Sequence, residues 1–149
     1  METPAYTDPG SWQIALEATD ATLSMSTARG PRTLYRTSEI SGAFYLRPDG
    51  SLAGFSLELP FSRRWGEPVT LSWEAADLDT DESVSLRLGE NETRADVSAL
   101  CVVVPGEPAY VKIVLETAFS PRSLRLPGLG LHRARPVTLR LFSEIRPAA

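Results

Sequence analysis

Apolar and polar residues alternate along most of this chain, and turn-forming residues interrupt the alternation every eight to twelve positions. The clearest segment runs from Phe55 to Phe61, where large apolar side chains occupy every second position. Successive side chains of a strand point to opposite faces, so this spacing predicts a strand with one buried face. Ile40–Leu46 predicts its partner, because Arg47-Pro48-Asp49-Gly50 is typical of a tight hairpin turn.

The rest of the chain repeats this pattern in shorter pieces. Ala99–Val104 differs, because its odd-numbered and even-numbered positions are all apolar. This predicts a strand that is covered on both faces. Pro121–Gly130 reads as irregular, and no stretch of ten residues carries a helical period. Further strands are predicted at Trp12–Leu16 (continuing or kinking through Leu23 and Met25), Leu34–Thr37, Val69–Trp73, Val84–Leu88, Val97–Val104, Val111–Phe119 and Val137–Ile145. We therefore expect a single all-β domain over residues 1–149, an antiparallel barrel or two-sheet sandwich of about eight to ten strands without substantial helix.

The composition is that of an ordinary globular chain, with 42% hydrophobic and 23% charged residues. A chain of 149 residues can bury a core without disulfides or metal ions. Met1–Pro4 does not start a signal peptide, and no apolar run is long enough to span a membrane. Cys101 is the only cysteine, so no intrachain disulfide is expected. These features predict a cytoplasmic protein that does not span a membrane.

The net charge of −4 is unevenly distributed along the chain. Residues 74–96 hold eight acidic residues and two arginines, whereas residues 120–146 hold six arginines and one glutamate. Nucleic-acid binding usually needs a basic domain, so the acidic balance argues against nucleic acid as a partner. Two interpretations stay open. The two segments are solvated surfaces that neutralise each other, or the arginine-rich one binds an anionic group such as a phosphate head group.

Residues suited to catalysis or metal binding are scarce. His132 is the only histidine, and no Gly-x-Ser-x-Gly segment is present to hold a nucleophilic serine. Cys101 lies in the most apolar run, which favours a packed thiol. Asp77–Glu82 alternates aspartates, but Glu82 and Leu88 stand where a calcium loop needs glycine and glutamate, so we expect a solvated loop. The sequence therefore predicts no catalytic residue, no metal site and no cofactor; an enzyme built on His132 is the weakest alternative.

Three segments, in this order, resemble the YceI-like family of lipocalin-type barrels. They are Trp12–Met25, Ile40–Phe44 with its outgoing strand Phe55–Phe61, and Leu129–Leu139. The chain departs from the family at its first strand, where Ala18-Thr19-Asp20 replaces the usual His-Ser. The resemblance implies a barrel that binds a polyisoprenoid or another amphipathic lipid.

Two functional hypotheses follow. The first is a non-enzymatic binding protein that holds an apolar or lipid-like small molecule inside a β-barrel, by apolar contact and by arginines that meet a polar head group. The residues predicted to contact that ligand are Phe44, Leu46, Phe55, Leu57, Leu59, Phe61, Leu71, Trp73, Ile113, Leu115, Arg133 and Arg135. The alternative is a structural or protein-interaction β-sandwich with a solid core, which forms a homodimer through an uncovered strand such as Leu100–Val104.

Overall fold

The computed structural model describes residues 12–47, 51–61, 69–75, 78, 83–106, 110–125 and 135–147. Strands dominate these residues, which confirms the all-β class, and the ten described strands lie within the predicted number. In chain order the elements are β1 (Trp12–Ile14), the 3-10 turn η2 (Leu16–Ala18), β2 (Asp20–Thr27), β3 (Gly30–Thr37), β4 (Ser41–Leu46), β5 (Leu52–Phe61), β6 (Val69–Ala75), β7 (Ser83–Leu88), β8 (Asn91–Val104), β9 (Tyr110–Phe119), α1 (Pro121–Leu124) and β10 (Val137–Pro147).

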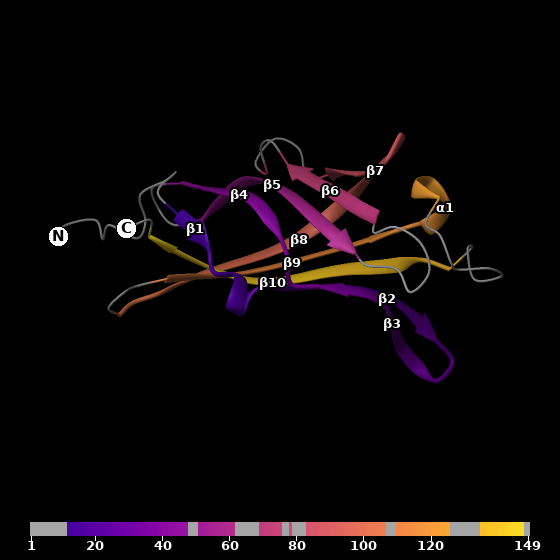
Figure 1. The fold of residues 1–149 in the computed structure, drawn as a ribbon, viewed down its shortest axis with the longest axis horizontal. Coiled ribbons are helices and arrows are strands. Elements are labelled where there is room, and N and C mark those ends of the chain that lie inside the picture. The colour runs from indigo at the N-terminus through magenta and orange to yellow at the C-terminus, as the bar shows by residue number, and fades with distance from the viewer. Residues whose placement is uncertain are drawn as a thin grey trace.

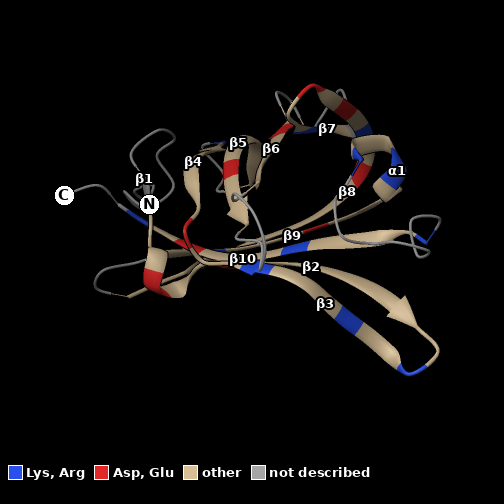
Figure 2. Ribbon diagram, turned by 45° about the vertical axis from the view of Figure 1, so that its right-hand side comes forward, with Lys and Arg blue, Asp and Glu red and all other residues tan. Residues whose placement is uncertain are grey.

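The strands form one antiparallel sheet that curls into a half-barrel (Figure 1). Its order is β3-β2-β10-β9-β8-β7-β6-β5-β4, and β1 pairs with β10 off this path. The longest strand, β8, joins the two halves of the sheet, because Asn91–Asp96 pairs with β7 and Val97–Val104 pairs with β9. Figure 2 shows the two halves facing each other, with β4 to β7 in one layer and β9, β10, β2 and β3 in the other.

The two outer strands of the sheet, β3 and β4, do not pair with each other among the described residues. Side chains bridge the space between the layers instead of backbone hydrogen bonds. The ring of Tyr35 on β3 lies 5.9 Å from the ring of Phe61 on β5, measured between centroids. On this side the two layers are therefore joined by side-chain packing, and no backbone hydrogen bonds connect β3 to β4 among the described residues.

The predicted hairpin of β4 and β5 is confirmed, with Phe44 opposite Phe55. Every second side chain of β5 points inward, so that Phe55, Leu57, Leu59 and Phe61 are all buried. The ring of Phe55 meets the indole of Trp73 edge to face at 5.3 Å, a favoured aromatic geometry. Burying one such side chain stabilises the fold by about 1.5–3 kcal/mol, so this layer supplies much of the stability.

Gly42 has a backbone requirement that only glycine meets easily. Its φ of 129° lies in a region that L-residues with a side chain rarely adopt. A Cβ at this position would collide with the carbonyl oxygen of Ser56 and lie 2.9 Å from Leu57 Cα. The glycine in the segment Ile40–Phe44 thus allows β4 to approach β5 closely.

The first predicted strand ends early. Trp12–Ile14 is extended and pairs with β10, but Leu16 starts the 3-10 turn η2 and is 52% exposed. The turn redirects the chain into β2, whose Leu23 and Met25 are buried as predicted. Leu16 was expected to share the buried face, and this prediction is wrong because a local turn replaces the strand.

The expectation that Ala99–Val104 is covered on both faces is also wrong. Leu100 is 60% exposed and Val102 is 43% exposed, both on the outer face of β8. Only Cys101 and Val103, at the other parity, pack partly against the core. A second difference is α1, a four-residue helix inside the segment read as irregular. No helix of the described residues is long and apolar enough to cross a membrane.

Candidate functional site

The ten apolar residues predicted to face a ligand all lie in the common interior of the half-barrel, and each is at most 4% exposed. They come from both layers: β4, β5 and β6 on one side and β9 on the other. The two arginines behave differently. Arg135 is exposed at the start of β10 and donates a hydrogen bond from Nη1 to the Ser26 carbonyl oxygen at 3.2 Å. Arg133 lies outside the described residues.

Trp73 carries a polar group into this apolar interior. The side chain is fully buried, and its indole Nε1 finds no hydrogen-bond acceptor within the described part of the protein. A buried donor without an acceptor destabilises a protein by about 1–3 kcal/mol, so most buried indole N–H groups have a partner. The interior therefore offers one hydrogen-bond donor that its own described side chains do not use.

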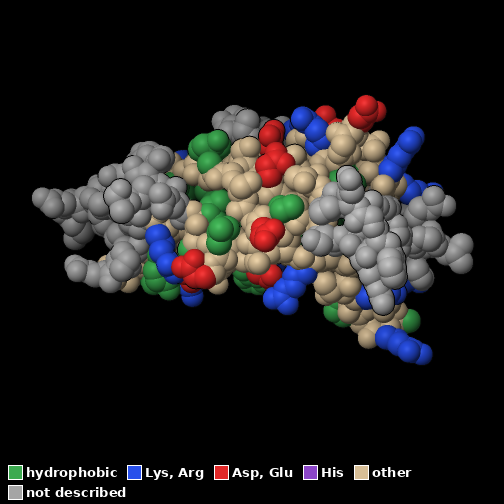
Figure 3. Space-filling model, viewed as in Figure 1, with side chains coloured by type: hydrophobic (Ala, Val, Ile, Leu, Met, Phe, Trp, Pro, Cys, Tyr) green, Lys and Arg blue, Asp and Glu red, His purple; other side chains and the backbone are tan. Residues whose placement is uncertain are grey.

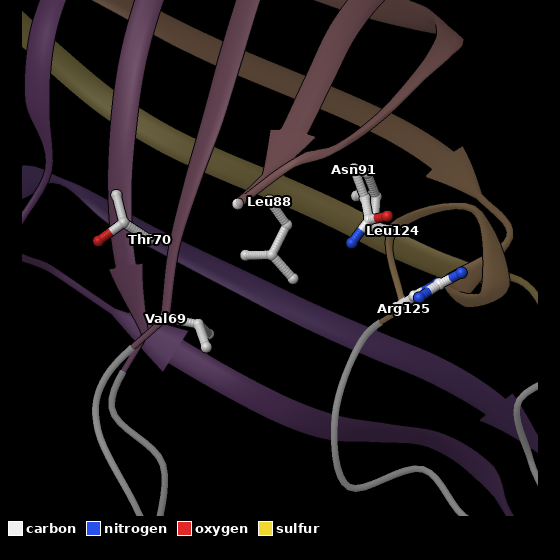
Figure 4. Close-up of a pocket in the computed structure, with 7 residues that line it drawn as sticks. Val69, Thr70, Leu88, Asn91, Leu124 and Arg125 are labelled. Carbon is white, nitrogen blue, oxygen red and sulfur yellow. The ribbon is translucent and has the colours of Figure 1, made fainter.

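A cavity of about 420 Å³ opens at the end of the half-barrel that carries α1 (Figure 4). We call it the mouth cavity; it is lined by Val69, Thr70, Leu88, Gly89, Asn91, Leu124 and Arg125. Val69 and Leu88 extend from β6 and from the end of β7, and Leu124 faces them from α1 (Figure 4). Leu124 is fully buried, so the short helix lines one side of the cavity and also packs against the hydrophobic core. The volume falls within the usual range for small-molecule sites.

Arg125 supplies the positive charge at the rim of the mouth cavity. It ends α1 in the left-handed conformation, with φ 52° and ψ 50°, and is the one described non-glycine residue with positive φ. Glycine or asparagine is the usual choice at such a position, because a Cβ raises the energy of this conformation. No carboxylate of the described residues pairs with its guanidinium. Strained residues that persist at a cavity are candidates for binding roles.

A second cavity, of about 610 Å³, lies between η2 and the ends of β2 and β3 that are nearest to it. Its lining is more polar and is crossed by an ion pair, in which Arg36 Nε lies 2.8 Å from Asp20 Oδ1. Glu17 in the same wall is bound by Arg146 at 2.6 Å. The pKa of Glu17 is lowered, first by a backbone hydrogen bond and then by the hydrogen bond from Arg146. The charges of this cavity already neutralise each other.

Chemistry of the catalytic type has little support in the described residues. They hold no group of three His, Cys, Asp or Glu side chains that could bind a metal ion. Cys101 is half-buried and packs partly against the core, in agreement with a packed thiol. His132, Asp77 and residues 79–82 lie outside the described residues. Two features remain: a packed apolar interior in which the Trp73 indole N–H has no described acceptor, and the mouth cavity with Arg125 at its rim, which none of the ten interior residues lines.

The mouth cavity could not be predicted from the sequence, because its lining comes from three separate segments. Leu88 and Val69 were predicted as ordinary strand residues, and Leu124 and Arg125 fell in the segment read as irregular. The one available signal was Ser120-Pro121, since proline at the first helical position often starts a helix. No protein-family model matches this chain, and no curated protein matches it.

Proposed function

We propose that this protein is a non-enzymatic binding protein that holds an amphipathic, lipid-like ligand within the half-barrel. The apolar part of the ligand contacts the inward side chains of β4, β5, β6 and β9, and its polar group lies at the mouth. The observation that carries the proposal is the mouth cavity, which combines apolar walls from three elements with Arg125, whose guanidinium pairs with no carboxylate of the described residues. Buried pockets that bind small molecules are mostly apolar and have a few convergent polar groups.

The geometry of the rim favours an acidic polar group on the ligand. Arg125 is a planar donor suited to carboxylate or phosphate oxygens, and Asn91 on the same side of the cavity carries a hydrogen-bonding side chain. Val69 and Leu88 offer apolar surface, and Thr70 lies beyond them on β6 (Figure 4). A fatty acid or an isoprenoid phosphate has the matching distribution of polar and apolar atoms.

Trp73 supports a ligand that reaches deep into the interior. It stands four residues along β6 from Val69, which is about 13 Å for an extended chain. An oxygen atom brought to this depth would satisfy the indole N–H, whereas a purely hydrocarbon ligand would leave it without a partner. We therefore propose a ligand with a second oxygen, or a ligand that enters together with one ordered water.

Native mass spectrometry of the protein purified from cells tests this proposal. We expect a fraction of the protein to carry an additional mass that organic extraction releases. Asn91→Trp places a large side chain in the rim of the mouth cavity and is expected to abolish this fraction. Glu92→Trp, the adjacent outward-facing position on β8, is the matched control and should retain it. Only the bare chain mass under gentle ionisation, in wild type and control alike, would contradict the proposal.

We further propose a cytoplasmic location, with which a single, half-buried cysteine, Cys101, is compatible. Fractionation of cells and detection of the protein with an antibody would test this, since recovery with the membrane or secreted fractions at high salt would contradict it.

A second candidate function, homodimerisation, is favoured by one observation on β8. Its segment Val97–Val104 pairs only with β9 among the described strands, so its other edge has backbone groups available for pairing. The segment carries no charged residue, and Leu100 and Val102 are exposed beside it. Native proteins usually protect such edges with charges, prolines or a partner. We propose that two copies pair through this edge.

Light scattering at several concentrations tests the dimer. We expect wild-type protein to have twice the chain mass at high concentration. Ser98→Lys places a charge in the edge strand and should give a monomer, whereas Ala118→Lys, at an exposed position of the inner strand β9, adds the same charge and should not. A wild-type monomer at every concentration would contradict this candidate.

A further inference from the structure

Arg36, Arg140 and Arg146 pair with carboxylates, at 2.8 Å from Asp20, 3.4 Å from Glu116 and 2.6 Å from Glu17. Six other arginines have no carboxylate partner in the described part of the chain. One of them, Arg87, lies on β7. We call the other five the mouth arginines: Arg29, Arg32, Arg122, Arg125 and Arg135.

The mouth arginines lie at one end of the half-barrel although they are far apart in sequence. The register places Val137 between Met25 and Phe119, so the β2–β3 turn, the start of β10 and the end of β9 are neighbours. Figure 2 shows the basic segments in a row, from α1 through the start of β10 to the tip of the β2–β3 hairpin. All five side chains are exposed. The row passes directly beside the mouth cavity, since Arg125 belongs to both.

The surface around this row is cationic. In Figure 3 the basic side chains over the tip of the β2–β3 hairpin, at the lower right, have no acidic side chain beside them. Basic side chains at the left and centre of the same view lie next to acidic ones. The described carboxylates nearest this end are Glu90, Glu92 and Asp96, all in or beside the β7–β8 hairpin. In Figure 2 this hairpin lies on the side of α1 away from the β2–β3 hairpin. Glu92 already accepts a hydrogen bond from Ser85 at 2.7 Å.

We infer that the mouth arginines form a docking surface for an anionic membrane. None of the large hydrophobic side chains that are exposed elsewhere belongs to the row, so binding is electrostatic and reversible; they are Leu16, Tyr45, Leu100, Val102 and Phe142. The choice of a membrane over another polyanion rests on the proposed function, because docking here turns the mouth cavity toward the lipid head groups.

Flotation of the full chain with lipid vesicles tests this inference. The wild-type protein is expected to bind vesicles that contain about 30% phosphatidylglycerol at about 0.05 M salt, and to release them at about 0.5 M salt. It should not bind vesicles of phosphatidylcholine alone. Each basic residue near an anionic surface contributes about a fivefold factor in affinity, so the triple variant Arg29→Gln/Arg32→Gln/Arg122→Gln should bind about a hundredfold more weakly.

The control carries the same change of charge at other positions. Arg36→Gln/Arg87→Gln/Arg140→Gln also removes three positive charges, but from outside the row, and should weaken binding less than about threefold. An equal loss in both triple variants would contradict the inference. Three other results would also contradict it: vesicle binding that does not weaken as the salt concentration rises, wild-type binding that is the same with and without phosphatidylglycerol, or binding to heparin or duplex RNA as tight as binding to the vesicles.

These outcomes are separate from the test of the proposed function. None of the three residues changed in the docking variant lines the mouth cavity, so native mass spectrometry should find the same ligand fraction in it as in wild type. If the protein binds vesicles but retains no ligand, the proposed function and the role of the cavity in facing the membrane are contradicted. The docking surface is then still supported. Retained ligand without vesicle binding would overturn the docking surface alone.

Discussion

The middle of the half-barrel and its mouth are built on different principles. In the middle, every inward position of β5 is filled by a buried apolar side chain, and Arg36 and Arg140 in the opposite layer pair with carboxylates. At the mouth, a cavity is left open, Arg125 holds a strained backbone conformation, and five arginines have no described carboxylate partner. The comparison indicates that the middle of the sheet supplies stability and that the mouth carries features which stability alone does not require.

The largest expected difference between the two regions is in packing. Leu57→Ala removes a fully buried side chain from the middle and should lower the free energy of unfolding by about 2–5 kcal/mol. Val69→Ala changes a half-buried residue at the mouth and should lower it by less than about 1 kcal/mol. Urea denaturation followed by tryptophan fluorescence measures both values. Equal losses would mean that the mouth is packed as tightly as the middle.

Gly42 tests how closely the strands of the middle approach one another. Gly42→Ala forces a Cβ against the Ser56 carbonyl at a positive φ, so we expect a loss of about 2–3 kcal/mol. Gly89→Ala, at the mouth-side turn, has positive φ but open space around the added atom, and should cost about 1 kcal/mol. Thermal denaturation compares the two variants. A smaller loss at Gly42 than at Gly89 would show that the close approach is not rigid.

Arg125 should separate stability from binding. Arg125→Gly removes the strain of the left-handed conformation, so the free energy of unfolding should rise by about 1 kcal/mol while the ligand fraction falls. Arg122→Gly, inside α1, is the control: it should lower the free energy of unfolding by about 1 kcal/mol without affecting the ligand. Calorimetry and native mass spectrometry on the same samples measure the two effects. A stabilised variant that keeps its ligand would remove Arg125 from the binding role.

The smallest expected effect is the pH dependence of the paired charges away from the mouth. Folding lowers the pKa of Glu17, so its contribution to stability is complete above the pKa of the unfolded chain and disappears as the pH falls through the folded pKa. Glu17→Gln should therefore be slightly less stable than wild type at about pH 7, and the difference should narrow toward about pH 3. Denaturation at both pH values measures this, and a difference that widens in acid would contradict it.

The middle of the fold could be predicted from sequence because its information is local. In β5 the strict alternation and the adjoining Pro48-Asp49-Gly50 turn fix the strand, its partner and its buried face together. The same alternation gave a wrong prediction at Leu16. This residue is spaced as the next inward residue of a strand, but the chain forms a turn there before it enters β2. It failed again at Leu100, because an apolar run predicts burial but does not specify what covers it.

The candidate site could be predicted only in its composition. The inward apolar residues follow from periodicity, and the basic character of the C-terminal third follows from the sequence. The mouth cavity does not, because Leu88, Leu124 and Arg125 become neighbours only through the curl of the sheet. Nor does the separation of the arginines into paired and unpaired groups, since this depends on the register between strands that are distant in sequence.

The way in which β8 serves two neighbours has a consequence for the size of the interior. Its hydrogen bonds to β7 end at Asp96 and those to β9 begin at Val97, so the two ladders share no residue. A small change of the backbone dihedrals at this junction would alter the angle between the layers without breaking either ladder. The peptide unit between Asp96 and Val97 is therefore the point where the two layers diverge, and the Thr117 hydroxyl, which donates to the Asp96 carbonyl oxygen, holds that point to β9.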